Sequence, residues 1–119
     1  METSILKSMK KVLGIPEDDD AFDETLLIHI NSTFATLHHL GVGPDDAFFI
    51  EDDTAVWSAF IEGPEYNSVK TYVGLKLRVL FDPPESSFGI TAMEKQITEF
   101  EWRLNQVREL TKWVDPATL

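Results

Sequence analysis

The chain has 119 residues, of which 43% are hydrophobic, and it contains no cysteine. This length is typical of one domain with one hydrophobic core, and the lack of cysteine excludes disulfides, thiol catalysis and cysteine-based zinc sites. No run approaches the roughly 20 apolar residues of a membrane helix, and the first residues lack the apolar core of a signal peptide, so we expect a protein that is made in the cytosol and does not enter membranes.

The net charge of −11 is distributed unevenly along the chain. Residues 12–69 contain thirteen acidic residues and no lysine or arginine, whereas residues 70–119 contain seven of each sign. Phosphate backbones are bound by clustered lysine and arginine, so the pattern indicates a poor nucleic-acid binder. The acidic half either promotes solubility, packs against the basic half of another subunit, or faces DNA and repels it.

Apolar residues at helical spacing predict a first helix over residues 4–13, with three lysines on its other side and a glycine after it. The acidic run at 18–20 precedes a second apolar series, where carboxylates suit the free N–H groups and the dipole of a helix N-terminus. This series predicts a helix that reaches about Leu40 and ends in a Gly-Val-Gly-Pro sequence.

Residues 45–53 are expected to form an acidic loop around one apolar run at 47–50. That run predicts either a short β segment or a segment that tucks under the core. A short helix is expected at 55–61, closed by glycine and proline, with Trp57 as a core residue.

The segment 68–82 fits two structures. Alternation at 75–79 is typical of a strand, whereas the apolar spacing of the whole segment fits a buried helix. A stretch of about 14 residues exceeds the usual ~5–6 residues of a strand, so we predict the central helix here. Gly74 argues against this helix, because glycine in a helix interior costs about 1 kcal/mol relative to alanine.

The last predicted helix opens at a capping-box pattern, Thr91 to Glu94, after a Pro-Pro connector. It carries an apolar seam for one partner helix, formed by Met93, Ile97, Phe100, Leu104, Val107 and Thr111. The two final helices are therefore expected to form a long antiparallel hairpin. We predict an all-α fold: one small helical bundle over residues 1–119, with the last residues as a flexible tail.

The sequence lacks the residue patterns that reactive sites need. No phosphate loop, dinucleotide fingerprint, nucleophile elbow or His-Glu-x-x-His pair occurs. His38 and His39 are adjacent and would point about 100° apart on a helix, and His29 lies further along the chain, so a shared metal ion is not expected. The acidic run at 18–20 lacks the glycine of a calcium loop. We predict no enzyme activity, no cofactor and no metal site.

Several short phrases follow one another in a specific order, at residues 11–15, 22–24, 29–32, 40–44, 68–73, 80–84, 93–97 and 101–103. Together, over about residues 5–105, they resemble the small head-tail connector (adaptor or head-completion) proteins of tailed bacteriophages and prophages. No single phrase is a catalytic signature, and the order and spacing carry the resemblance.

The resemblance implies a structural virion subunit that is synthesised in the host bacterial cytoplasm and works at the head-tail interface. It implies a homo-oligomeric ring, a dodecamer in the virion, that sits beneath the portal protein and extends the DNA channel. A tail terminator or stopper protein would bind below, and DNA would pass without specific binding. The alternative is a small acidic regulator or adaptor that mimics DNA or binds a basic protein partner.

Two sets of interface residues are predicted. The first set, which would dock on the portal or on a neighbouring subunit with Trp113 as its anchor, comprises Arg108, Lys112, Trp113, Val114, Asp115 and Pro116. The second set would join acidic residues of one subunit to basic residues of the next, or line the channel. It comprises Asp45, Asp46, Glu51, Asp52, Asp53, Lys70, Lys76 and Arg78.

Overall fold

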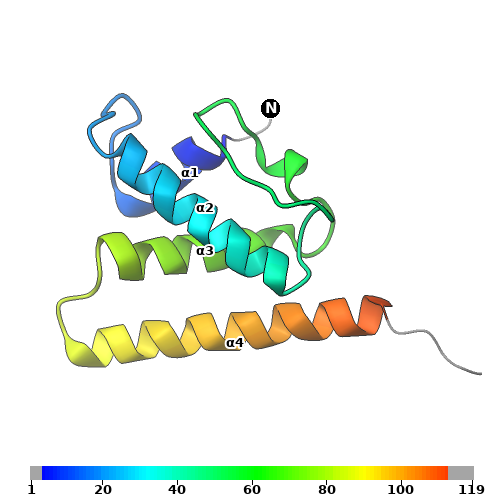
Figure 1. Cartoon of the computed structure of the whole chain (residues 1–119). Helices are drawn as coiled ribbons and strands as arrows, with labels where there is room; N and C mark the ends of the chain where they lie inside the picture. The colour runs from blue at the N-terminus through cyan, green and yellow to red at the C-terminus, as the bar shows by residue number, and fades with distance from the viewer. Residues whose placement is uncertain (1–3, 113–119) are drawn as a thin grey trace, which may run out of the picture.

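The computed structural model describes residues 4–112, and the side chains of residues 4–106. The described part contains α1 (Ile5–Leu13), α2 (Asp23–His39), the 3-10 helix η1 (Trp57–Ala59), α3 (Tyr66–Phe81) and α4 (Ser87–Lys112). Helix α3 lies in the middle, with α1 and α2 on one side and α4 running antiparallel along the other (Figure 1). No strand occurs between residues 4 and 112, so the predicted all-α class is confirmed.

The hydrophobic core is centred on α3, because every other α-helix packs against it. Four α3 side chains are fully buried: Val69, Tyr72, Val73 and Leu77. Helix α2 contributes a stripe at helical spacing, Leu26, Ile30, Phe34 and Leu37, as its sequence predicts. Among the α4 side chains up to residue 106, Ile97 and Leu104 are the ones that are buried.

Helix α1 begins and ends where its sequence predicts. The Ser4 hydroxyl accepts a hydrogen bond from Lys7 N at 3.3 Å, and Gly14 takes the left-handed conformation (φ 75°) that ends the helix. Helix α1 packs on α3 beside Gly74, where a Cβ atom would lie 3.4 Å from Val12 Cγ1, an ordinary van der Waals distance. The packing of α1 on α3 therefore leaves room for a methyl group at this position.

The prediction that residues 18–20 cap α2 is wrong. The helix begins at Asp23, and its N-cap residue, Phe22, makes no side-chain capping bond. Residues 14–22 instead fold back over α1, where the carbonyl oxygens of Glu17 and Asp19 accept hydrogen bonds from Lys10 Nζ at 3.3 and 2.8 Å. The acidic run at 18–20 is therefore part of this turn and does not cap α2.

The run at 47–50 forms no strand, and the alternative of a segment tucked under the core is the correct one. Ile50 is buried, and the Phe48 ring packs edge-on against Phe34, at a centroid distance of 5.2 Å. The helix predicted at 55–61 is shorter and forms the single turn η1, in which Trp57 is buried as expected.

Helices α3 and α4 form the predicted long hairpin, but α4 starts at Ser87 and not at Thr91. The cap is Ser86, whose hydroxyl accepts a hydrogen bond from Gly89 N at 3.0 Å. In the seam, Ile97 and Leu104 are buried and Met93 and Phe100 pack against the core, as predicted. The side chains of Val107 and Thr111 lie outside the described residues.

Candidate subunit and partner interfaces

The predicted acidic residues are displayed on one exposed segment, 45–53. Asp45, Asp46, Glu51, Asp52 and Asp53 are all exposed. Two hydrogen bonds from Thr54, the first from its hydroxyl and the second from its backbone N–H, lower the pKa of the Asp52 carboxyl, so this group stays charged under mildly acidic conditions.

Two interactions hold this acidic segment against α2. The Asn31 side chain donates to the Ile50 carbonyl at 2.9 Å and accepts from the Ile50 N–H at 2.7 Å. Phe48 faces inward, where it also packs 5.1 Å from the Phe60 ring. Phe49 therefore faces outward and is 63% exposed between the flanking carboxylates. The result is a fixed segment that presents one aromatic ring within an acidic surface.

The predicted basic partners, Lys70, Lys76 and Arg78, all belong to α3. Lys70 lies over the Tyr66 ring, with Nζ 5.8 Å from its centroid, and Lys76 Nζ lies 4.0 Å from Glu101 Oε2. Arg78 Nε is buried and has no hydrogen-bond partner within residues 4–106. In the described part of the chain, no ion pair joins these bases to the acidic segment, so one copy does not bring the two predicted sets together.

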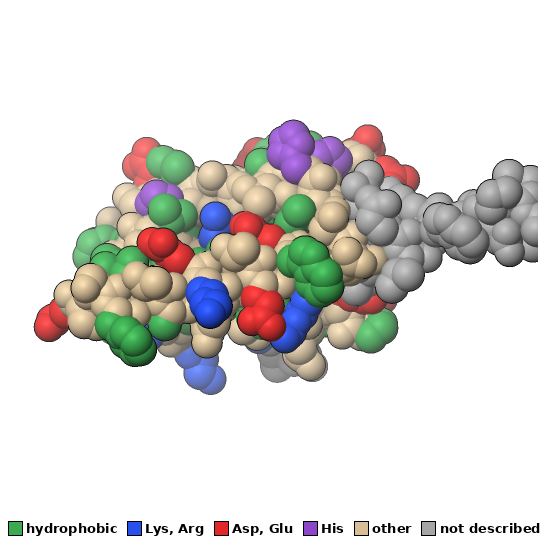
Figure 2. Space-filling model, turned by 90° about the horizontal axis from the view of Figure 1, so that it is seen from below, with side chains coloured by type: hydrophobic (Ala, Val, Ile, Leu, Met, Phe, Trp, Pro, Cys, Tyr) green, Lys and Arg blue, Asp and Glu red, His purple; other side chains and the backbone are tan. Residues whose placement is uncertain are grey.

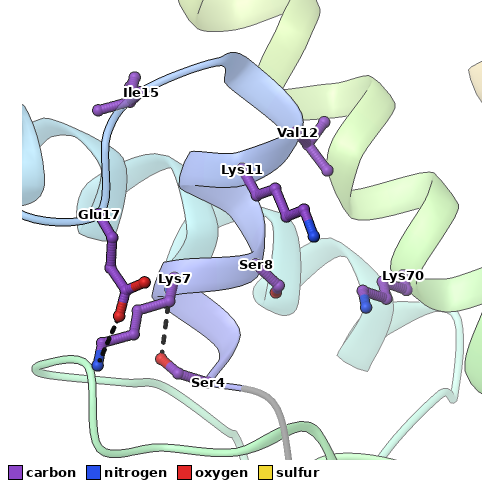
Figure 3. A pocket seen from close by; sticks show the side chains of 8 residues that line it. All are labelled: Ser4, Lys7, Ser8, Lys11, Val12, Ile15, Glu17 and Lys70. Atoms are coloured by element: carbon purple, nitrogen blue, oxygen red, sulfur yellow. Dashed lines mark hydrogen bonds and ion pairs between the residues drawn. The ribbon is translucent and has the colours of Figure 1, made fainter.

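An open groove of about 780 Å³ lies where α1, the turn after it and α3 meet. It is lined by Ser4, Lys7, Ser8, Lys11, Val12, Ile15, Glu17 and Lys70. Figure 3 shows the amino groups of Lys11 and Lys70 on one side of Ser8, and the Lys7–Glu17 pair on the other. We call it the basic groove, because three lysines and one carboxylate surround it.

One rim of the basic groove is neutralised within the same copy. Lys7 Nζ lies 3.0 Å from Glu17 Oε1 and 3.9 Å from Asp53 Oδ2. The hydrogen bond with Glu17 and its charge, with a smaller contribution from Asp53, raise the pKa of Lys7 above its usual value. Lys11 is exposed and makes no ion pair within residues 4–106, so the opposite rim keeps its positive charge.

The outer face of α4 carries mixed charges. Figure 2, which views the molecule from the α4 side, shows basic and acidic side chains close together, with separate apolar side chains between them. Within α4, Phe88 and Trp102 are exposed, and Arg103 pairs with Glu99 at 2.5 Å, one helical turn away. Trp102 also lines a shallow depression of about 440 Å³ with Pro64 and Phe100. The Trp102 side chain, which is 63% exposed, is therefore available for contact.

The predicted docking residues at the C-terminal end cannot be placed by their side chains. Arg108 and Lys112 belong to α4, but their side chains lie outside the described residues. Trp113, Val114, Asp115 and Pro116 follow the last described residue. This set stays a prediction.

Three polar residues that organise these surfaces were missed in the sequence: Ser8, Lys10 and Asn31. Each lies within a helix where its neighbours indicate only periodicity. Lys10 sits beside Lys7 and Lys11, and only the turn that folds over α1 distinguishes it from them. Asn31 forms hydrogen bonds with Ile50, which lies 19 residues further along the chain. No local signal identifies these partners, because each lies at a distant position in the chain.

Within residues 4–106, no group of three or more histidine or acidic side chains is arranged to hold a metal ion. The pKa of the Tyr72 hydroxyl is raised above its usual range by burial first and then by the hydrogen bond and charge of Glu101. This tyrosine joins α3 to α4 in the interior. Among the described helices, none is long and apolar enough to cross a membrane.

The chain matches the family described as phage connector protein over residues 5–111. This match covers nearly all of the described residues and extends slightly beyond the span of the recognised phrases. No curated protein and no solved structure matches the chain. Because the family match covers far more than half of the sequence, the chain belongs to the phage connector proteins, a structural family whose members join the head and tail of the virion.

Proposed function

We propose that this connector forms a homo-oligomeric ring, a dodecamer in the virion, beneath the portal of the filled capsid. The ring joins the capsid to the tail, receives a stopper or tail terminator protein below, and extends the DNA channel. The observation that carries the proposal is the family match over residues 5–111. The exposed acidic segment on α2 and the basic groove between α1 and α3 support it, because head-to-tail contacts within a ring need two different complementary surfaces on each copy.

The charge of the chain supports passage of DNA without specific binding. The net charge of −11 leaves few lysine or arginine side chains to neutralise phosphates, so DNA meets little attraction along a wall of these subunits. The acidic segment of one copy either contacts the bases of the next copy or lines the channel. Of the predicted bases, Lys76 already pairs with Glu101, so Lys70 and Arg78 are the better candidates for contact between copies.

We propose that the C-terminal end, from Arg108 to Pro116, docks on the portal with Trp113 as its anchor. A chain that ends at residue 109 should lose portal binding, whereas its helix content, measured by circular dichroism, should fall only by the removed turn. The control is the full-length Trp102→Ala chain, which removes an exposed tryptophan of α4 and keeps the tail. Unchanged portal binding by the truncated chain would exclude this role for the tail.

The alternative, a small acidic protein that mimics DNA, makes a different prediction. The exposed carboxylates of segment 45–53 favour it, since a row of charges on a fixed backbone can resemble phosphates. Light scattering with and without the portal separates the two functions. A connector gains mass as a complex with the portal, whereas a DNA mimic stays a monomer and competes with duplex DNA for a basic protein.

A further inference from the structure

We propose that the basic groove of one copy receives the acidic segment 45–53 of a second copy, with the Phe49 ring seated against Val12 and Ile15. This contact deepens the proposed ring and rests on that function. It assigns a binding site to α1, which the sequence did not place in any interface, and it gives the exposed phenylalanine of the acidic segment a partner.

The first argument is the distribution of positive charge. The first 70 residues contain four lysines and no arginine: Lys7, Lys10, Lys11 and Lys70. Lys10 is buried against Asp23, and the other three line the basic groove. All the accessible positive charge of this acidic half is therefore gathered around one depression. Only Glu17 opposes it from within the lining, so the groove attracts carboxylates.

The second argument is the apolar floor between the lysines. Val12 is 43% exposed, and Ile15 lines the groove beside it. A phosphate backbone would pair with the lysines, but it would leave the apolar Val12 and Ile15 side chains in contact with charged groups. The net charge of −11 also repels a phosphate backbone. An apolar ring flanked by carboxylates satisfies both parts of the groove. The protein offers that combination at Phe49, which is 63% exposed and lies between two acidic residues on one side and three on the other.

The third argument is that the two surfaces lie on different elements. Asn31 fixes the acidic segment on α2, whereas the groove is formed by α1, the turn that follows it and α3. Contact between the segment of one copy and the groove of the next uses two different patches, so every added copy presents a free patch of each kind. Asp53 already lies near Lys7 of its own copy, which leaves Asp45, Asp46 and Glu51 for Lys11 and Lys70 of the neighbour.

Disulfide trapping tests the contact directly, because the natural chain contains no cysteine. A Phe49→Cys chain and a Val12→Cys chain are mixed under mild oxidation, alone at high concentration and together with the portal. Both positions are exposed, so both variants should fold, as circular dichroism checks. The proposal predicts a disulfide-linked dimer of the two different chains. The matched control is Ile28→Cys, an apolar residue on α2 that is 61% exposed and lies outside both surfaces.

The contact is contradicted if Phe49→Cys links to Ile28→Cys as efficiently as to Val12→Cys, or to neither chain under either condition. A charge exchange adds a second measurement: Lys11→Glu should lose assembly, and Asp46→Lys in the same chain should recover part of it. Loss of assembly without recovery, together with a Lys11-dependent affinity for duplex DNA, would assign the groove to phosphates and overturn the proposal.

Portal binding, measured on the same samples, separates this inference from the proposed function. Portal binding without the Phe49–Val12 disulfide rejects the contact and keeps the connector ring. The disulfide without portal binding keeps the contact between copies and rejects the proposed place beneath the portal.

Discussion

Lys10 Nζ lies 2.6 Å from Asp23 Oδ1, although the lysine side chain is only 4% exposed. The buried carboxylate oxygen has no hydrogen bond within residues 4–106, so the charge of Lys10 is its compensation. The same amino group donates to two carbonyls of the turn between α1 and α2. One side chain thus fixes the turn that carries Ile15 and Glu17 to the edge of the basic groove.

The Lys10–Asp23 pair should therefore stabilise the fold. We expect Asp23→Ala to lower the free energy of unfolding by about 2 kcal/mol, less than the ~3–5 kcal/mol typical of a fully buried pair, because the Asp23 side chain is 31% exposed. Adding Lys10→Met should restore part of the loss, since methionine leaves no buried charge. Urea unfolding of the two single variants and the double variant measures this coupling, and purely additive losses would show that the pair has none.

The Ser8–Trp57 contact links α1 to η1. Trp57 Nε1 donates to the Ser8 hydroxyl at 2.8 Å, and Ser8 donates to the Ile5 carbonyl, all in the interior. Ser8→Ala leaves the buried indole N–H without this partner, which should cost about 1–3 kcal/mol in unfolding free energy. Trp57 fluorescence during denaturation is a suitable readout. Unchanged stability in Ser8→Ala would mean that the indole finds another acceptor.

The Tyr72–Glu101 hydrogen bond, 2.6 Å long, connects α3 to α4. Tyr72→Phe should destabilise the protein by about 1–2 kcal/mol, because it removes the hydroxyl that donates to the charged Glu101 carboxylate at a partly buried site. The raised pKa adds a pH dependence. Above about pH 10 the unfolded tyrosine loses its proton while the folded one keeps it, so folded stability falls as the pH rises.

Comparing the variant with the natural chain isolates this effect from other groups that titrate at high pH. The difference in unfolding free energy between the two proteins should be constant below pH 10 and should shrink above it. A constant difference through this range would show that the pKa of Tyr72 is not raised by its surroundings.

Two glycines should respond in opposite ways to alanine. Gly74→Ala should raise the unfolding free energy by up to about 1 kcal/mol, because the new Cβ makes an ordinary contact with Val12 in a helix interior. Gly43→Ala should lower it by about 2 kcal/mol or more, because φ is +94° and the Cβ would lie 2.6 Å from the Phe60 ring. Thermal unfolding of both variants checks the signs, and a destabilised Gly74→Ala would indicate that α1 and α3 cannot accommodate a methyl group.

Helical periodicity predicted the elements that carry a long apolar stripe. Helix α2 and the central helix α3 follow from such stripes, and the length of the α3 segment decided correctly against a strand. The predicted start of α4 at Thr91 is wrong, because the Ser86 hydroxyl already accepts from Gly89 N–H and caps the helix one turn earlier. Residues between the two positions include the exposed Phe88, so the first turn of α4 has no apolar pattern facing the core.

The interface geometry was less predictable, because it depends on contacts between distant residues. The sequence correctly placed the acidic segment on the surface, yet nothing near Asn31 indicates that this side chain fixes Ile50. Similarly, the sequence predicts only that Lys7 and Lys11 lie on one face of a helix. That they line a groove with Lys70 depends on how α1 packs on α3. Local sequence patterns predict which side chains are buried, whereas only the folded structure shows which charged side chains lie next to each other on the surface.

Electron microscopy of the portal incubated with this protein tests the connector role most directly. We predict a closed ring of added density beneath the portal, coaxial with its channel, that fails to form when Lys11→Glu is introduced. A portal that stays bare while the protein remains a monomer, at concentrations well above those in an infected cell, would contradict the account.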